Sequence, residues 1–346
     1  MQNRPSASSI EIFSTCPPWS GGDGRTYLDA VVVAAHWSEA AGCRGMLVYA
    51  DNAQVDPWLV THTIVQQTTS LSPLVAVQPV YMHPYSVAKL VTSIGHLYRR
   101  RLYLNMVAGG FKNDLTALHD TAPHDRRYDR LGEYTTIVQR LLGSSAPVTY
   151  AGEFYTVTLL KLTPPLDGSL FPGIFVSGSS EAGLVTARAL GATAIEYPKP
   201  ASEYAAAAPD GVTSAGIRVG VISRERDDEA WEVANARFPE DRRGQLSHQL
   251  AMKVSDSVWH KQLSKLSDLG ARSPYWLVPF QNYKTMCPYL VGSHDRVGDE
   301  LATYLEVGYR TFILDVPVSL EDLQHTMRAF RRALETARCQ SYSTSG

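Results

Sequence analysis

Short apolar segments alternate with amphipathic ones along most of the chain. Eight apolar segments are typical of β-strands, namely residues 10–13, 45–49, 74–77, 102–107, 173–176, 192–195, 217–223 and 310–315. Helical patterns separate most of them, and the clearest is Asp125–Leu142, where apolar side chains recur at helical spacing. Strands and helices that alternate in this way favour parallel strands joined by crossovers, and eight such units close a barrel. We therefore predict an α/β fold, a (β/α)8 TIM barrel.

The predicted barrel forms a single domain over residues 1–339, and residues 340–346 have the composition of a flexible tail. Phe238–Met286 is a long insertion between strands 7 and 8, and Val148–Tyr155 has the pattern of a small hairpin after helix 4. The insertion is rich in aromatic residues, namely Trp259, Tyr275, Trp276, Phe280 and Tyr283. These side chains either form a lid that excludes water or pack in an ordinary core.

An open, doubly wound sheet is the main alternative fold. Such sheets usually carry a glycine-rich phosphate loop of GxGxxG spacing after their first strand. The glycine-rich stretch Ser20–Gly24 follows the first predicted strand but lacks that spacing. The barrel is therefore the preferred prediction.

Charge and cysteine content limit the classes of function. The 346 residues carry a formal net charge of -2, which argues against a nucleic-acid partner, and no apolar window is long enough for a membrane span. The four cysteines are scattered, and no spacing of histidine or cysteine indicates a metal site. The polar N-terminus does not resemble a signal peptide. These features predict a cytoplasmic protein with reduced thiols, no metal and no membrane partner.

Polar side chains stand at the carboxyl ends of several predicted strands, where TIM barrels place their active sites. Asp51 follows the second strand, Gln78 follows the third, and Asn105 lies in the fourth. Asp51 either binds a ligand or caps the next helix, and the glycines after Asn105 either admit a flat ring or form a simple turn. Arg218 lies inside the seventh strand, where an arginine is costly unless it is paired or faces a ligand.

Gly178, Ser179 and Ser180 join a buried strand directly to a helix. Backbone N–H groups and two hydroxyls at such a junction suit a phosphate, although a plain helix N-cap at Ser179 or Ser180 is the alternative. A second helix begins near His124 and carries Tyr128 in its first turns, which also suits an anion. Here the alternative is a surface turn with Asp125 as the cap.

The order of these motifs resembles the bacterial-luciferase-like flavin monooxygenases, and within them the alkanesulfonate monooxygenase branch. The resemblance covers residues 10–333 and rests on the segments 56–60, 74–79, 105–110, 124–128, 178–180, 216–218, 224–225, 228–231 and 308–314. It implies a TIM barrel, commonly a homodimer, that uses O2 and reduced FMN delivered by a separate NAD(P)H-dependent flavin reductase. It also implies that the FMN phosphate is held by Gly178, Ser179, Ser180 and Tyr128, and that the ring and ribityl chain are lined by Asp51, Gln78, Asn105 and His124.

Several catalytic residues of the alkanesulfonate branch are replaced in this chain. Gln54 stands where that branch has a Cys, Gly220 where it has a His, and Val316 where it has a Tyr. The strand arginine is kept as Arg218. The catalytic candidates are therefore Arg218, Gln54 and His124, and the expected substrate is a small organic metabolite other than a simple alkanesulfonate.

Two further functions fit the same scaffold. One is an oxidoreductase that uses the deazaflavin F420 and transfers hydride without O2. The other is a non-catalytic flavin-binding subunit, since the replaced side chains include several that are catalytic in the alkanesulfonate branch.

Overall fold

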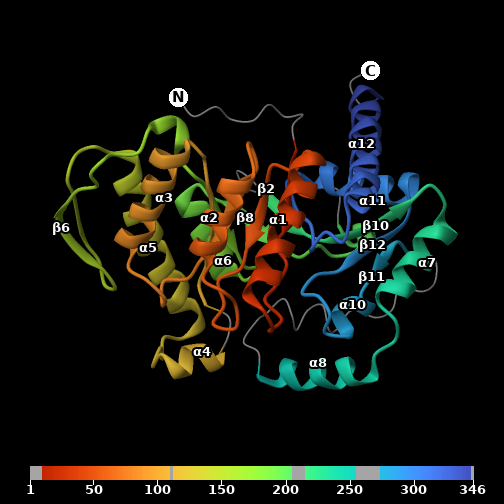
Figure 1. Ribbon diagram of the computed structural model, residues 1–346, viewed down its shortest axis with the longest axis horizontal. Coiled ribbons are helices and arrows are strands. Elements are labelled where there is room, and N and C mark those ends of the chain that lie inside the picture. Colours follow the sequence, from red (N-terminus) through yellow and green to blue (C-terminus); the bar gives the residue numbers. More distant parts are fainter. Residues whose placement is uncertain (1–9, 110–111, 205–214, 255–272, 344–346) are drawn as a thin grey trace.

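Eight parallel strands form a closed barrel in the computed structural model, which describes residues 10–109, 112–204, 215–254 and 273–343. The order around the barrel is β1-β13-β9-β8-β7-β4-β3-β2, which confirms the predicted fold (Figure 1). The barrel strands are β1 (Glu11–Thr15), β2 (Gly45–Val48), β3 (Ser72–Val77), β4 (Tyr103–Val107), β7 (Gly173–Ser177), β8 (Thr193–Glu196), β9 (Ala215–Arg218) and β13 (Tyr309–Ile313). Each apolar segment identified in the sequence contributes one of them.

Helices surround the barrel, with α3 and α5 on one side of it and α11 and α12 on the other (Figure 1). Asp56 shows how one of them begins, because its carboxylate accepts hydrogen bonds from the backbone N–H groups of Trp58 and Leu59. The described helices are α1 (Gly24–Ala40), α2 (Pro57–Gln67), α3 (Pro84–Tyr98), α4 (Lys112–Ala117), α5 (His124–Gly143), α6 (Glu181–Leu190), α7 (Asp227–Arg237), α8 (Arg242–Val254), α10 (Val278–Gln281), α11 (His294–Val307) and α12 (Leu320–Ser343).

Alternation along the strands decides what fills the barrel. The interior holds an apolar layer that consists mainly of Phe13, Leu47, Leu74, Tyr103, Phe175, Ile195 and Ile313. The Phe13 and Phe175 rings meet edge to face with their centroids 5.4 Å apart. Side chains two positions apart on a strand point to the same face, so the residues that follow this layer also point inward. The apolar layer is thus the floor beneath whatever lies at the carboxyl ends of the strands.

The seventh predicted strand, residues 217–223, is in fact two strands. After Arg218 the backbone leaves the barrel: Val219 N donates to Ile313 O of β13, and Gly220 N donates to Pro288 O outside it. Residues Gly220–Arg224 form β10, which pairs with β12 (Tyr289–Ser293), and β12 pairs with β11 (Tyr275–Trp276) in a separate three-stranded sheet. A continuous apolar run does not reveal a change of sheet, because both strands are buried.

The described part of the insertion contains the helices α8 and α10 and the short strand β11, and it leads into β12 and α11. The predicted hairpin is present as β5 (Val148–Ala151) paired antiparallel with β6 (Thr156–Leu160), so its second strand begins only after the predicted end at Tyr155. At the carboxyl end, α12 continues to Ser343, past the predicted start of the tail at residue 340.

Candidate active site

Inward-facing polar side chains form a ring at the carboxyl ends of the barrel strands. Each lies two positions beyond an inward-facing residue, as Tyr49 does beyond Leu47 and Asp315 beyond Ile313. The ring contains Tyr49, Gln78, Asn105, Ser177, Tyr197, Arg218 and Asp315. Polar groups above an apolar floor at this end of a TIM barrel are the usual setting of an active site.

Arg218 is the only positive charge among the ring residues named, and its residue is 8% exposed. Its Nη2 donates to Tyr49 Oη at 2.7 Å, and its guanidinium carbon lies 5.4 Å from the centroid of the Tyr49 ring. Its Nε is buried without a hydrogen-bond partner in the described structure. Burial raises the pKa of Tyr49, although the charge of Arg218 opposes this rise. The sequence analysis expected Arg218 to be paired or to face a ligand. Tyr49 pairs with its Nη2, whereas its Nε remains available for a ligand.

Asp315 lies close to Arg218 in the ring and is held by two hydroxyls. Thr285 Oγ1 and Tyr289 Oη both donate to Asp315 Oδ2, at 2.6 and 2.7 Å. Burial, with the charge of Asp315, raises the pKa of Tyr289 well above its usual range. The same two causes raise the pKa of the neighbouring Cys287 thiol to about 12, so this cysteine is not an activated nucleophile.

The amides of Gln78 and Asn105 lie in the ring as expected. Gln78 Nε2 donates to Ala50 O, and Ser177 Oγ donates to Asn105 Oδ1 at 2.7 Å. Both residues are buried. Within the described ranges, no protein group forms a hydrogen bond with Gln78 Oε1 or Asn105 Nδ2. Each amide therefore keeps one polar atom for a ligand.

Gly178, Ser179 and Ser180 follow directly on the ring residue Ser177, and Tyr128 of α5 packs against them. A Cβ on Gly178 would lie 2.1 Å from Tyr128 Oη, so only glycine fits beside the Tyr128 phenol. Ser180 is the N-cap of α6, and its Oγ accepts from Gly183 N at 3.2 Å. Ser179 Oγ is buried and has no partner in the described structure. The N-cap alternative is therefore correct for Ser180, whereas Ser179 is left free for a ligand.

Three other predicted site residues make contacts outside the ring. Asp51 Oδ1 accepts from Ala53 N at 2.8 Å, and burial, with the charge of Asp114, raises its pKa. Gln54 Oε1 accepts from Trp19 N at 2.6 Å. His124 Nδ1 lies 2.7 Å from Asp125 Oδ1. The His124 ring packs 5.3 Å from the ring of Tyr128, the residue that packs against Gly178. The N-cap position of α5 is Pro123, so the alternative with Asp125 as the cap is wrong.

The sequence reasoning missed Tyr49, Tyr197 and Asp315. The signal that locates them is the inward alternation, because each lies two positions beyond an apolar residue of the barrel floor. Tyr275 and Phe280 of the insertion are buried, and Tyr275 Oη donates to Pro198 O at 2.8 Å, which favours the packing alternative over a lid. Trp259 lies outside the described residues.

The described structure shows neither a metal site nor a membrane span. No group of three or more His, Cys, Asp or Glu side chains in the described ranges is arranged to hold a metal ion. None of the described helices has the length and apolar character needed to cross a membrane.

The comparisons with known proteins agree with this architecture. The chain is 32% identical over 330 residues to the 4-(gamma-L-glutamylamino)butanoyl-[BtrI acyl-carrier protein] monooxygenase BtrO of Niallia circulans, which covers 92% of this chain and 96% of that protein. Among solved structures, the long-chain alkane monooxygenase LadA matches with a TM-score of 0.69 at 16% identity, covering 96% and 92% of the two chains. An F420-dependent secondary alcohol dehydrogenase matches with a TM-score of 0.62 at 15% identity, covering 94% of this chain and 99% of that one.

Likeness at such low identity shows that the fold is shared, and the fold serves both monooxygenases and an F420-dependent dehydrogenase. The family model is more specific, because the luciferase-like monooxygenase model matches residues 11–311. The chain therefore belongs to the luciferase-like monooxygenase family.

Proposed function

We propose that the protein is a two-component monooxygenase that uses reduced FMN and O2 to oxidise a small organic metabolite other than a simple alkanesulfonate. The observation that carries the proposal is the cradle at Gly178–Ser180, in a chain that belongs to a monooxygenase family. The reduced FMN comes from a separate NAD(P)H-dependent flavin reductase, and the enzyme acts as a homodimer, as the family resemblance implies.

The cradle suits the phosphate of FMN. Ser179 Oγ is a buried donor without a partner, and the N-terminus of α6 adds backbone N–H groups and the positive end of the helix dipole. Gly178 keeps Tyr128 in place because it has no side chain to displace the phenol. Ser179, Ser180 and Tyr128 would hold the phosphate, with His124 beside Tyr128.

Reduced FMN, when bound, supplies two electrons, so that one atom of O2 enters the substrate and the other leaves as water. The protein positions the reactants. Gln78 and Asn105 are buried and held by Ala50 and Ser177, so their remaining polar atoms would be available to bind the flavin ring in a fixed orientation. Arg218 binds an anionic group of the substrate, which satisfies its unpartnered Nε.

We expect the substrate to resemble that of the BtrO relative more closely than an alkanesulfonate. A Cβ on Gly220 would lie 2.3 Å from Tyr289 Cζ, so the Tyr289 ring fills the space of the side chain that this branch has there. The name of the relative describes an acyl group that ends in a γ-glutamyl amide, whose terminus carries an α-ammonium and an α-carboxylate. We propose a substrate of this kind, an acyl chain with an amino-acid terminus.

Oxygen incorporation tests this function. The full chain is incubated under 18O2 with FMN, a flavin reductase, NADH and the pantetheine thioester of 4-(γ-L-glutamylamino)butanoate, and the product is weighed by mass spectrometry. We expect the product to gain one labelled oxygen atom, and Arg218→Gln to lose this gain. Arg310→Gln is the matched control, because Arg310 lies on the adjacent strand and donates to the backbone carbonyls of Leu305 and Tyr309. If the protein reduces F420 with a secondary alcohol, and no labelled oxygen enters the thioester in the FMN assay, the protein is instead a dehydrogenase.

A further inference from the structure

The carboxylate of Asp315 has no cationic partner in the described structure. Its two hydrogen bonds, from Thr285 and Tyr289, both go to Oδ2. Neither Asp315 nor Arg218 belongs to an ion pair within 4.0 Å among the described residues, although the charge of Asp315 influences the pKa of Arg218. A partly buried carboxylate and a buried guanidinium therefore face the same ring without neutralising each other by contact, which is costly unless a ligand contacts both.

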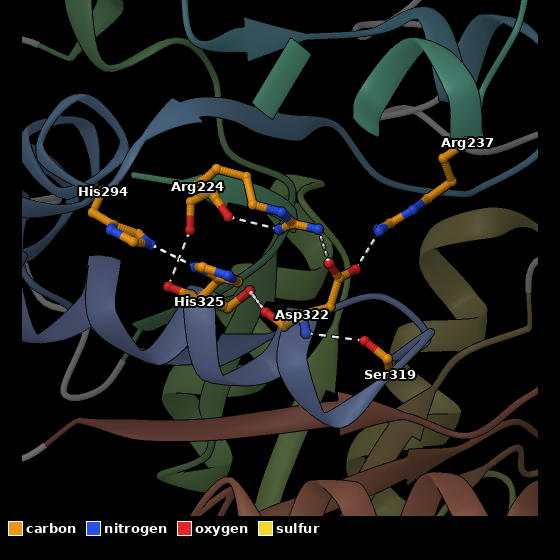
Figure 2. A network of polar contacts seen from close by, with 8 residues as sticks. Arg224, Arg237, His294, Ser319, Asp322 and His325 are labelled. Carbon is orange, nitrogen blue, oxygen red and sulfur yellow. Dashed lines mark hydrogen bonds and ion pairs between the residues drawn. The ribbon is translucent and has the colours of Figure 1, made fainter. Parts of the chain in front are cut away.

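The nearby arginines are already engaged elsewhere. Figure 2 shows Asp322 of α12 between Arg224 of β10 and Arg237 of α7, and each guanidinium pairs with a different oxygen of that carboxylate. Ser319 Oγ accepts from Asp322 N, which fixes the start of the helix that carries this carboxylate. Arg237 lines the same cavity as Asp315, but its charge is balanced by Asp322. The positive charge that Asp315 needs must come from another source.

A small cavity of about 20 Å³ lies against Asp315. Its other lining residues include Tyr289, Arg237, Asp322 and Val316. A space of this size holds roughly one water molecule, which is about the size of an ammonium group. Asp315 is the one residue of the polar ring that lines it. Two of the departures from the alkanesulfonate branch border this place, because Val316 lines the cavity and Gly220 makes room for the Tyr289 ring.

Arg218 ends β9, and Asp315 lies just beyond the end of the adjacent strand β13. Ile313 of β13 is in register with Arg218 of β9, and Asp315 follows Ile313 by two residues, or about 7 Å along the chain. Tyr49 holds Arg218 on one side, while Tyr289 and Thr285 hold Asp315 on the other. The site thus presents a fixed positive pole and a fixed negative pole a short distance apart.

We propose that Asp315, held by Tyr289 and Thr285, binds the α-ammonium group of the substrate while Arg218 binds its α-carboxylate. This pair of poles selects an amino-acid terminus over a simple anion, and the assignment rests on the function proposed above. Asp315 is the residue that determines this specificity, and Tyr289 and Thr285 are positioning residues for its carboxylate.

Binding without turnover tests the assignment. The full chain is titrated by calorimetry, in the absence of FMN, with 4-(γ-L-glutamylamino)butanoate and with the analogue in which the α-amino group is replaced by hydrogen. We expect the wild type to prefer the amino compound by about tenfold or more, as for a charged hydrogen bond. Asp315→Asn should remove most of this preference, and Tyr289→Phe should reduce it. Equal affinity of the wild type for the two compounds would overturn the assignment, and this result needs no variant to fold.

The matched control is Asp295→Asn, which removes an exposed carboxylate that pairs with Arg332 on the outer helices. This variant should keep the wild-type preference, and an Asp315→Asn protein that also keeps it would contradict the proposal. The outcome is independent of the oxygenation test. Oxygen gain without a preference for the amino compound rejects only the Asp315 assignment, whereas the preference without oxygen gain rejects only the proposed monooxygenase reaction.

Discussion

Gly178 is the residue on which the phosphate cradle depends most directly. Its φ of +151° lies in a region that other residues rarely adopt, and a Cβ there would meet Tyr128 Oη at 2.1 Å. We expect Gly178→Ala to cost about 1–3 kcal/mol of stability and to weaken FMN binding by about tenfold or more, because Tyr128 must move. Flavin fluorescence titration and thermal unfolding measure the two effects.

Gly168→Ala is the matched control for this substitution. Gly168 begins a short helical turn on the surface, and a Cβ there would meet no atom within 4 Å. This variant should bind FMN like the wild type. Unchanged FMN affinity in Gly178→Ala would show that the cradle does not hold the phosphate.

Single residues of the site were predictable only where their chemistry is unusual for their place in a strand. Arg218, Gln78 and Asn105 are polar residues in or directly after apolar runs, so the sequence alone predicts them as candidates. Tyr49 looks like an ordinary strand residue, and only the inward alternation of the closed barrel assigns it to the site. Gln54 stays a prediction: in the described structure its side-chain oxygen accepts a hydrogen bond from the backbone N–H of Trp19, a contact that its sequence position does not reveal.

At the scale of elements, Glu39 joins the end of α1 to the turn before β3. Its carboxylate accepts backbone hydrogen bonds from Thr69, Ser70 and Leu71. Burial would raise the pKa of Glu39, but these bonds, from Ser70 above all, lower it to about 2. The pKa is lower in the folded protein than in the unfolded chain, so the ionised carboxylate stabilises the fold above about pH 4.5 and loses this contribution as the pH falls toward 2.

We therefore expect Glu39→Gln to lower the free energy of unfolding at pH 7 by about 1–2 kcal/mol, a value reduced for the partial exposure of the side chain. The difference from the wild type should shrink below about pH 4.5. Urea unfolding across this pH range measures it. Glu306→Gln, at an exposed position of α11, is the control and should change little. A difference that stays constant with pH would mean that the charge of Glu39 is not what stabilises the turn.

The elements themselves follow from the sequence because strand and helix periodicities differ, and all eight barrel strands were found in this way. What the pattern does not contain is the partner of each strand. The predicted strand 217–223 combines the end of β9 (Ala215–Arg218) with most of β10 (Gly220–Arg224), yet β9 belongs to the barrel and β10 to the sheet with β12. Strand pairing is decided by contacts distant in sequence, such as that of Gly220 N with Pro288 O, which local periodicity does not record.

For the whole molecule, the proposed homodimer needs an apolar surface, and α2 and α3 offer one. Leu59 and Leu97 are 66% and 71% exposed on these helices. His62 Nε2 of α2 lies 2.6 Å from Tyr98 Oη of α3, which brings the two helices together near these leucines. We propose that these two exposed leucines on adjacent helices are part of the surface that the second subunit covers.

We expect the wild type to sediment as a dimer and the Leu59→Glu, Leu97→Glu double variant as a monomer, because two buried charges on each side of a twofold interface are strongly unfavourable. Sedimentation velocity at several protein concentrations measures the change. Leu159→Glu is the matched control, since Leu159 is also 71% exposed but lies on the hairpin strand β6. If the double variant remains dimeric, the subunits do not meet through α2 and α3. The same conclusion follows if the Leu159→Glu control also dissociates.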